Sequence, residues 1–402
     1  MILVEKKLNT PCYIISKEKF EKNIKLFENK FAEHMEGKIP LLGYSVKTNH
    51  ASELMKCALS AGMAAEVVSD DEYYHALNCG FKADNIIYNG PQKSEKTLIW
   101  ALKSGSIVNL DNFDEIEMIK KNISQLELDS LKLGIRVNFD LEALCPGETT
   151  AREVVSRFGF CVENGDFDRA VVMLQEMGIT VRGIHMHYSS TSRSTLIYKE
   201  LSAMAGQMIE KYFMDISGFF VDMGGGFFLG EQENTPGKPT LDEYAKMISG
   251  ELKKYVPLEN IRMILEPGAS IIATSVKYLT KVLNERIVRD SKVLTLDGSI
   301  LHINPFMSKR YPAAKVIYSN ERRENIDKQI LCGSTCMEND RFLEIDCDKE
   351  IKKGDYLLCN LAGAYTMGFN SCFINLPPYI YVEENQEYRM TRGKEPDLMR
   401  KI

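Results

Sequence analysis

The sequence predicts an α/β fold in which a closed, TIM-like (β/α)8 barrel precedes a second, mainly antiparallel β-domain. Over residues 39–266, short apolar and β-branched runs alternate with longer segments of helical period. Eight such units are the number that closes a parallel barrel. After Gly268 the strand-like runs continue without helices between them. An open, doubly wound sheet is the alternative that the alternation leaves open.

Each predicted barrel strand is a short apolar run that ends at glycine or polar residues, and all but the last precede a helical segment. In chain order the strands are IPLLGYSVK, AAEVVS, NIIYNG, SIVNLD, LKLGIRVN, ITVRGIHMH, GFFVDMGGG and IRMILEPG. The helical segment SEKTLIWALKSG shows the signals well, because serine caps its start and glycine ends it. A longer loop, CPGETTAREVVSRFGF, follows the fifth strand.

The second domain is predicted from strand-like runs that follow the barrel. These runs are SVKYLTKVLNERIV, KVLTLDGSILHI, KQILCGS and DYLLCNLAGAYTM. The N-terminal PCYIIS is expected to add one strand, and ENQEYRMTRGKEPDLMRKI to be a frayed or helical tail. We therefore expect a barrel domain over residues 28–268 and a β-sandwich or barrel-like domain from residues 1–27 and 269–402.

Composition narrows the function classes. The 402 residues are 44% hydrophobic and 26% charged, ordinary values for a globular protein. A net charge of -6 without a long basic run argues against nucleic acid or an anionic membrane as partner. The N-terminus has no long apolar core, so we expect no signal peptide or membrane span. Ten cysteines without a CxxC pair indicate reduced thiols and a cytoplasmic location, and we expect no metal.

Chemistry in a parallel barrel collects at the carboxyl ends of its strands. Polar and glycine residues fall at four of these ends: Lys47 at the first, His185 and His187 at the sixth, Gly224, Gly225 and Gly226 after the seventh, and Glu266 and Gly268 at the eighth. Although they are far apart in sequence, these residues should converge on one face of the barrel.

An amine, a glycine turn and a carboxylate together point to pyridoxal phosphate. A lysine forms a Schiff base with the aldehyde, glycine N–H groups bind the phosphate, and a carboxylate pairs with the pyridine nitrogen. Each residue has an ordinary alternative when read alone. Lys47 could be a strand-end lysine with its ammonium in solvent, the glycines a tight strand–helix turn, and Glu266 a capping or ion-paired carboxylate.

Taken together, the motifs resemble those of the fold type III pyridoxal-phosphate decarboxylases, the group of diaminopimelate, ornithine and carboxynorspermidine decarboxylases. The motifs YSVKTN, SRFGF, GIHMHYSS, DMGGGF, EPG, CGSTCMEND and GAYT follow in the order and spacing of that family. The resemblance runs through nearly the whole chain. It implies α-decarboxylation of a small-molecule amino acid.

The resemblance also implies roles around the cofactor ring. Lys47 would form the Schiff base, His187 would stack on the ring and Glu266 would pair with the pyridine nitrogen. Since His185 and His187 point to the same side of a strand, at most one should touch the ring. His185 is then expected to be a core histidine with satisfied hydrogen bonds.

For the phosphate, the resemblance implies Ser190, Gly226 and Gly268, with a hydrogen bond from Tyr365. Cys336 would return a proton to Cα. In this family that cysteine comes from the neighbouring subunit, so the resemblance implies a head-to-tail homodimer with shared active sites.

The substrate end departs from the family pattern. The family usually reads EPGR, whereas this chain has Ala269, and the acidic residue that usually follows the catalytic cysteine is Met337. Glu338 could replace that acid, and Arg193 and Arg310 could bind an anion. We therefore expect a non-standard, carboxylated or conjugated amino acid from a specialised pathway, such as that of a siderophore or antibiotic precursor. Diaminopimelate decarboxylase of lysine biosynthesis is the alternative.

Two other classes fit less well. Amino-acid racemases of this fold carry an arginine at the pyridine nitrogen, where this chain has Glu266. Non-catalytic homologues lose the lysine or the cysteine, whereas this chain keeps Lys47 and Cys336.

Overall fold

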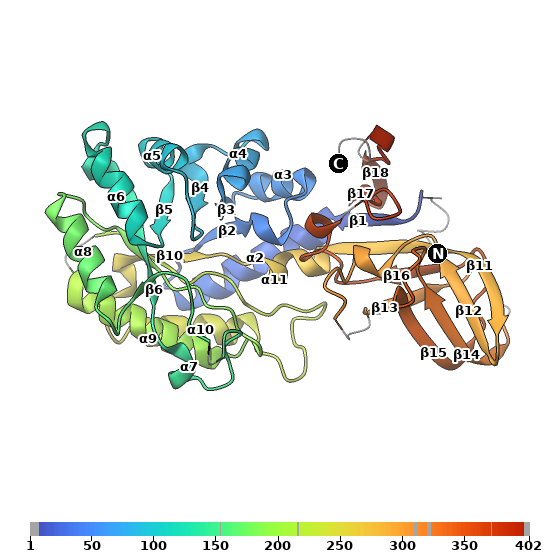
Figure 1. The fold of residues 1–402 in the computed structure, drawn as a ribbon. Helices are drawn as coiled ribbons and strands as arrows, with labels where there is room; N and C mark the ends of the chain where they lie inside the picture. Colours follow the sequence, from blue (N-terminus) through green and yellow to red (C-terminus); the bar gives the residue numbers. More distant parts are fainter. Residues whose placement is uncertain are drawn as a thin grey trace. The chain divides into compact units, whose positions relative to one another are not determined.

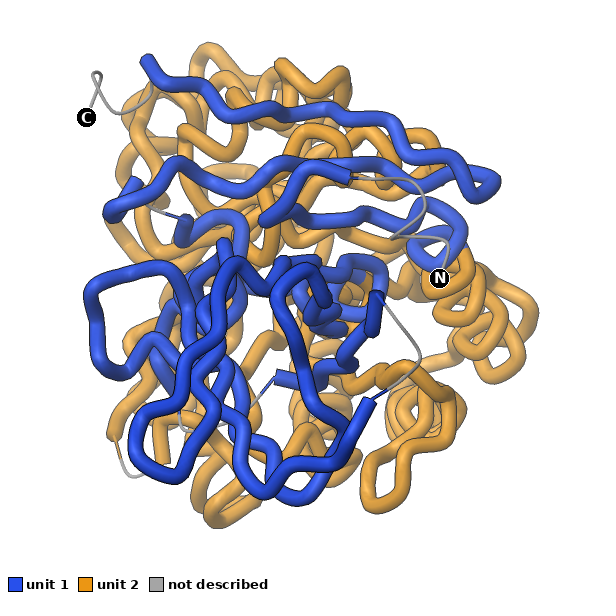
Figure 2. Tube along the Cα trace, turned by 90° about the vertical axis from the view of Figure 1, so that its right-hand side faces the viewer, with its two compact units in different colours: residues 1–21, 272–402 blue, residues 22–271 orange. Residues whose placement is uncertain are grey.

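The computed structural model describes residues 8–152, 154–214, 217–308, 312–319, 323–370 and 372–397. The chain divides into two compact units, residues 22–271 and residues 1–21 with 272–402, which Figure 2 colours separately. Within the described residues, each unit is built on one nine-stranded sheet. No described helix is both long enough and apolar enough to cross a membrane.

Residues 22–271 form a closed parallel barrel, as predicted. Its strands are β2 (Leu41–Ser45), β3 (Ala64–Val67), β4 (Ile86–Tyr88), β5 (Ile107–Leu110), β6 (Lys132–Asn138), β8 (Gly183–His185), β9 (Phe219–Asp222) and β10 (Ile261–Leu265). They are hydrogen-bonded in the order β5-β4-β3-β2-β10-β9-β8-β6, and pairing of β5 with β6 closes the ring. This closure excludes the open sheet. The short strand β7 (Phe160–Cys161) pairs with β6 outside the ring.

A helix of two or more turns follows each barrel strand except the last, and Figure 1 shows these helices flanking the strands. They are α3 (Ser52–Ser60), α4 (Asp70–Asn78), α5 (Glu95–Lys103), α6 (Phe113–Lys121), α8 (Asp166–Glu176), α9 (Thr195–Tyr212) and α10 (Leu241–Leu252). Helix α2 (Lys17–His34) precedes β2, and α7 (Leu141–Leu144) and α11 (Ala269–Ile272) are single turns. Five α-helices have an N-cap residue whose side chain accepts a backbone N–H of the first turn: Ser69, Ser94, Asn112, Asp140 and Thr240. These residues therefore make the hydrogen bonds expected of residues that cap the start of a helix.

Short 3-10 turns complete the connections: η1 (Val46–Thr48), η2 (Ala83–Asn85), η3 (Ile123–Gln125), η4 (Leu128–Ser130), η5 (Leu258–Asn260), η6 (Ala273–Ser275), η7 (Ile300–His302) and η8 (Met367–Phe369).

An apolar layer fills the interior of the barrel. Phe220 projects inward and packs with buried side chains of four other strands, Ala64, Ile87, Ile107 and Ile264. Strands β8 and β6 have glycine beside this ring, at Gly183 and Gly134, and the absence of a Cβ leaves space for it. A Cβ on Gly183 would lie 2.2 Å from the Phe220 ring, and one on Gly134 would lie 2.7 Å from it. The barrel is therefore a packed core, and space for a ligand has to lie beyond this layer.

The other unit is mainly antiparallel, as predicted. Its strands are β1 (Cys12–Ser16), β11 (Val276–Val288), β12 (Ser291–Leu296), β13 (Ala314–Ile317), β14 (Asn325–Cys332), β15 (Arg341–Lys349), β16 (Tyr356–Cys359), β17 (Tyr379–Glu384) and β18 (Glu387–Arg392). Only β1–β17 and β12–β14 pair in parallel among the described strands of this unit. The N-terminal strand β1 lies between β11 and β17.

The C-terminal segment corrects one expectation. We expected a frayed or helical tail, but β18 pairs antiparallel with β17. The two residues between these strands, Asn385 and Gln386, have φ values of 51° and 64°. Two left-handed residues in succession make the tight turn whose twist matches a hairpin, so the polar segment folds back as an edge strand.

Candidate active site

A polar layer lies directly beyond the apolar layer of the barrel. Side chains two residues apart on a strand point to the same side. Advancing two residues from each apolar position gives a polar residue: Glu66 from Ala64, Asn89 from Ile87, Asn109 from Ile107, Asp222 from Phe220 and Glu266 from Ile264. The same step from the glycines gives Arg136 from Gly134 and His185 from Gly183. All seven residues of this polar layer are buried.

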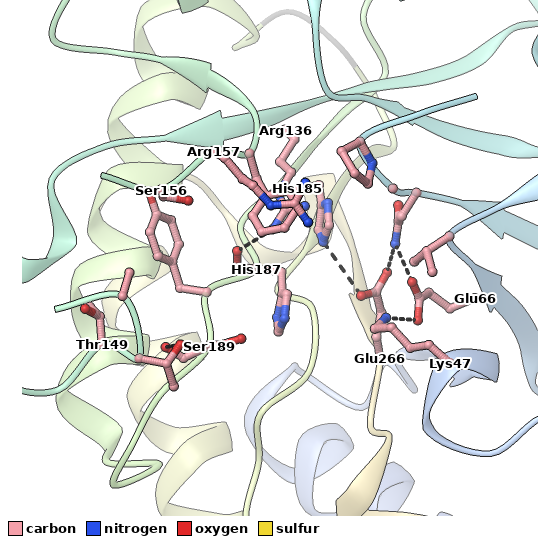
Figure 3. A pocket seen from close by; sticks show the side chains of 18 of the residues that line it. Lys47, Glu66, Arg136, Thr149, Ser156, Arg157, His185, His187, Ser189 and Glu266 are labelled. Atoms are coloured by element: carbon pink, nitrogen blue, oxygen red, sulfur yellow. Dashed lines mark hydrogen bonds and ion pairs between the residues drawn. The ribbon is translucent and has the colours of Figure 1, made fainter. Parts of the chain in front are cut away.

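All of the polar layer except Asn109 and Asp222 lines a cavity of about 440 Å³, whose lining side chains appear in Figure 3. Lys47 reaches this cavity from η1, just after β2 ends at Ser45. Its Nζ lies 2.5 Å from Oε2 of Glu66, which is buried on β3. The strand-end lysine is therefore held against a buried carboxylate, while about a third of its side chain (35%) stays exposed to the cavity.

Glu266 follows β10 and is held by amide groups. Asn89 donates from Nδ2 to Glu266 Oε1 at 2.5 Å and to Glu66 Oε1 at 3.2 Å. The side-chain oxygen Oδ1 of Asn89 accepts a hydrogen bond from Asn109 Nδ2 at 2.8 Å. This bond fixes the orientation of the Asn89 amide. One asparagine therefore links the carboxylate beside Lys47 to the carboxylate at the end of β10.

Asp222 lies beside Glu266 and shares its environment. The ligand atoms of Asp222, Glu266 and His185 lie within 4.8 Å of one another. Burial and the neighbouring Glu266 raise the pKa of Asp222 well above its usual range. Burial would also raise the pKa of Glu266, but His185, Lys47 and the hydrogen bond from Asp222 outweigh it and lower that pKa. The pair therefore carries one proton, on Asp222, and Glu266 is ionised.

These three groups have the composition of a metal site. Two of their oxygens, however, already accept protein hydrogen bonds. Asp222 Oδ1 accepts from the Gly224 N–H at 2.9 Å, and Glu266 Oε1 accepts from Asn89. The arrangement suits an ionised carboxylate that accepts a hydrogen bond from a ligand.

The two histidines lie in parallel planes, with ring centroids 6.2 Å apart and an interplanar angle of 6°. His187 follows β8; its Nδ1 accepts the Gly225 N–H at 3.2 Å, and its carbonyl accepts from Arg136 Nη2 at 3.1 Å. Burial, and then the charges of Arg136 and Lys47, lower the pKa of His187 to about 3. Its imidazole is neutral and fixed, so it offers a flat face to the cavity.

His185 is buried, as expected of a core histidine, but its hydrogen bonds are not satisfied. Both ring nitrogens lack a hydrogen-bond partner among the described residues, and Nε2 lies 3.7 Å from Glu266 Oε2, too far for a hydrogen bond. Burial lowers the pKa of His185, against the charge of Glu266, which raises it. Because His185 also lines the cavity, its ring nitrogens are available to a polar ligand bound there.

The glycine turn after β9 leaves no room for side chains. A Cβ on Gly224, which has a φ of +64°, would lie 2.4 Å from His187 Cβ, and one on Gly225 would lie 2.5 Å from the Glu266 carbonyl oxygen. Gly226 has a φ of +97°, and its N–H donates to no other described residue. An exposed N–H in a turn without side chains is what an anion site requires.

A second closely packed glycine, Gly268, lies after β10. A Cβ on Gly268 would lie 2.3 Å from Thr48 Oγ1. That hydroxyl and Ser270 Oγ are buried without a hydrogen-bond partner among the described residues. The residues therefore fit pyridoxal phosphate: Lys47 for the aldehyde, His187 for the ring face, Glu266 for the pyridine nitrogen, and the glycine turns for the phosphate.

Several predicted residues do not line this cavity, and they include the glycines Gly224, Gly225, Gly226 and Gly268. Ser189, not Ser190, lines it, and Ser190 Oγ accepts the Arg193 N–H at 2.7 Å to close a turn. Arg193 itself is not among the lining residues. Arg310 lies outside the described residues.

Four further predicted residues belong to the other unit. Cys336, Met337 and Glu338 lie in the loop between β14 and β15, where Cys336 is exposed. Asp340 organises that loop by accepting the Thr335 N–H at 3.0 Å. Tyr365 is also exposed.

Comparison with known proteins gives one family. The family described as "Pyridoxal-dependent decarboxylase, pyridoxal binding domain" matches residues 17–273. Among curated relatives, diaminopimelate decarboxylase of Zymomonas mobilis is 24% identical, with 98% of this chain and 90% of that protein covered. That of Archaeoglobus fulgidus is 27% identical, covering 93% and 87%.

Solved structures show the same fold. Diaminopimelate decarboxylase from M. jannaschii in complex with L-lysine superposes with a TM-score of 0.86 at 24% identity, covering 100% of this chain and 93% of that one. The Paramecium bursaria Chlorella virus arginine decarboxylase superposes with a TM-score of 0.75 at 19% identity, covering 93% and 96%. The fold is therefore shared with decarboxylases whose names give different substrates.

Proposed function

This chain belongs to the pyridoxal-dependent decarboxylases, and on that premise we propose that it removes a carboxylate from diaminopimelate. Its cofactor is pyridoxal phosphate and its reaction class is amino-acid decarboxylation. The observation that carries the choice of substrate is that relatives matching 93–98% of the chain bear the name diaminopimelate decarboxylase. They favour this alternative over the specialised-pathway substrate that the sequence led us to expect.

Pyridoxal phosphate, when bound, supplies an electron sink for the pair left by the departing carboxylate. The protein has to provide a nucleophilic amine and to stabilise the charge that develops. Glu66 Oε2, 2.5 Å from Lys47 Nζ, can accept the ammonium proton and leave a neutral amine. Asn89 donates to the other oxygen of Glu66 and keeps that carboxylate aimed at the lysine.

Glu266 would hold the pyridine nitrogen of the cofactor. Its depressed pKa keeps it ionised, so it can hold a proton on the pyridine nitrogen. Asn89 and the protonated Asp222 fix its orientation without adding a second negative charge. Because the site is buried, this charge is little screened and its effect on the ring is large.

A second candidate substrate remains, and Ala269 is the observation that favours it. This residue begins α11, where the family has an arginine that can bind an anion. Met337 likewise cannot pair with a distal ammonium. A carboxylated or conjugated amino acid, held by other residues, is therefore the second candidate.

Carbon dioxide release tests the first of these candidates. Purified holoenzyme is given meso-diaminopimelate, L-lysine, L-ornithine and L-arginine in parallel. We expect turnover of meso-diaminopimelate to exceed that of the others, and Lys47→Ala to abolish it. Absence of release from meso-diaminopimelate would refute the substrate, whereas full activity of the alanine variant would refute the role of Lys47.

We further propose that the active enzyme is a head-to-tail homodimer in which Cys336 of one subunit protonates Cα in the site of the other. Family resemblance and the exposure of Cys336 support this. Mixing unfolded Lys47→Ala and Cys336→Ala chains and refolding them should restore about a quarter of wild-type activity, because half of the chains pair with the other variant and each mixed dimer has one intact site. No recovery in mixed dimers isolated with two different affinity tags would refute the shared site.

A further inference from the structure

Three cationic side chains line the cavity, and two of them already have a carboxylate partner. Lys47 contacts Glu66, and Arg136 Nη1 lies 3.3 Å from Oδ1 of the buried Asp111. The third, Arg157, lies at the cavity wall and makes no ion pair with any described residue.

Arg157 is exposed, and its guanidinium contacts the ring of the next residue. Its guanidinium carbon lies 4.4 Å from the centroid of the Phe158 ring, and that of Arg136 lies 4.5 Å from the same centroid. In Figure 3 these two arginines lie at one wall, apart from Lys47 and Glu66. Two like charges at one ring repel each other, and an anion bound beside them would relieve that repulsion.

The backbone around Arg157 is fixed. One amide, Asn138 Nδ2, donates to the carbonyl of Ser156 at 3.1 Å and to that of Phe158 at 2.5 Å. Gly159 has a φ of +73°, and a Cβ there would lie 2.8 Å from the Arg136 carbonyl oxygen. The backbone that carries Arg157 is therefore held on β6, while Arg157 itself is exposed.

We propose that Arg157 binds the second carboxylate of the substrate, the one that the reaction does not remove. In this way it would select dicarboxylic amino acids. The inference rests on the proposed function, since diaminopimelate has a carboxylate at each end. A guanidinium can hold a carboxylate with two parallel hydrogen bonds, so lysine would replace it only in part.

The test uses holoenzyme and two probes without amino groups. Pimelate is the dicarboxylate with the carbon chain of diaminopimelate, and heptanoate is the monocarboxylate of equal length. Isothermal titration gives Kd for each with wild type, Arg157→Gln and Arg157→Lys. Arg169→Gln is the matched control, because Arg169 stacks on Phe113 at 3.8 Å, is exposed, and does not line the cavity.

We expect wild type and Arg169→Gln to bind pimelate roughly 10-fold or more tightly than heptanoate, the size of one charge-assisted contact. Arg157→Gln should lose that preference and Arg157→Lys should keep part of it. An unchanged preference in Arg157→Gln, or none in wild type, would overturn the inference. Binding needs no turnover, so an Arg157-dependent preference without carbon dioxide release from diaminopimelate would refute only the proposed substrate.

Discussion

Replacing Asp222 with asparagine should change how stability depends on pH. In the unfolded chain Asp222 ionises near the ordinary aspartate pKa of about 3.9, but burial and Glu266 raise its pKa and keep it protonated in the folded protein. Folding therefore takes up a proton above that pH, and stability falls as pH rises. The expected slope is about 1.4 kcal/mol per pH unit, the free energy that corresponds to one proton. Asparagine is neutral in both states and removes this slope.

The assay is urea unfolding of the cofactor-free protein at several pH values between about pH 5 and pH 7. Because other titrating groups are common to both proteins, they cancel in the difference between wild type and Asp222→Asn. That difference should grow in favour of the variant as pH rises. Asp168→Asn is the control, since hydrogen bonds to Tyr212 and Lys211 lower the pKa of Asp168 and leave it ionised in both states. Parallel profiles for wild type and Asp222→Asn would refute the shared-proton pair.

Two further predictions concern the two layers of the barrel. Gly183→Ala should destabilise the fold by about 1–3 kcal/mol, because its Cβ would overlap the Phe220 ring, and Phe220→Leu in the same chain should recover part of the loss in a urea titration. Equal stability of Gly183→Ala and wild type would contradict the described packing. Asn89→Ala should lower kcat roughly 10- to 100-fold, since Glu66 and Glu266 each lose a donor, whereas cofactor content should fall far less. An unchanged kcat would show that neither carboxylate depends on Asn89.

Strand positions were predictable because each barrel strand is a short buried run between helices with clear caps. Sequence reasoning also found Lys47, His187 and Glu266 at strand ends. It missed the buried Glu66, Asn89, Asn109, Arg136 and Asp222. Each of these interrupts an apolar strand two residues after a residue that packs in the interior, so the two-residue period could have found them.

Other features depend on tertiary contacts that no local pattern carries. The role of Gly183 and Gly134 is set by Phe220, which belongs to a different strand. The hairpin of β17 and β18 depends on left-handed φ values at Asn385 and Gln386. Asn-Gln is a weaker signal for such a turn than Asn-Gly. His185 was expected to be satisfied because a buried ring usually is, and only the cavity beside it shows otherwise.

The central claim is that Lys47 binds the cofactor at the polar layer of the barrel. Borohydride reduction of the holoenzyme, followed by peptide mapping, tests it most directly. The cofactor should be found on the peptide that contains Lys47, and the visible absorbance should be absent from Lys47→Ala before reduction. Labelling of another lysine, such as the buried Lys93 that pairs with Glu115, would contradict the assignment of the cavity.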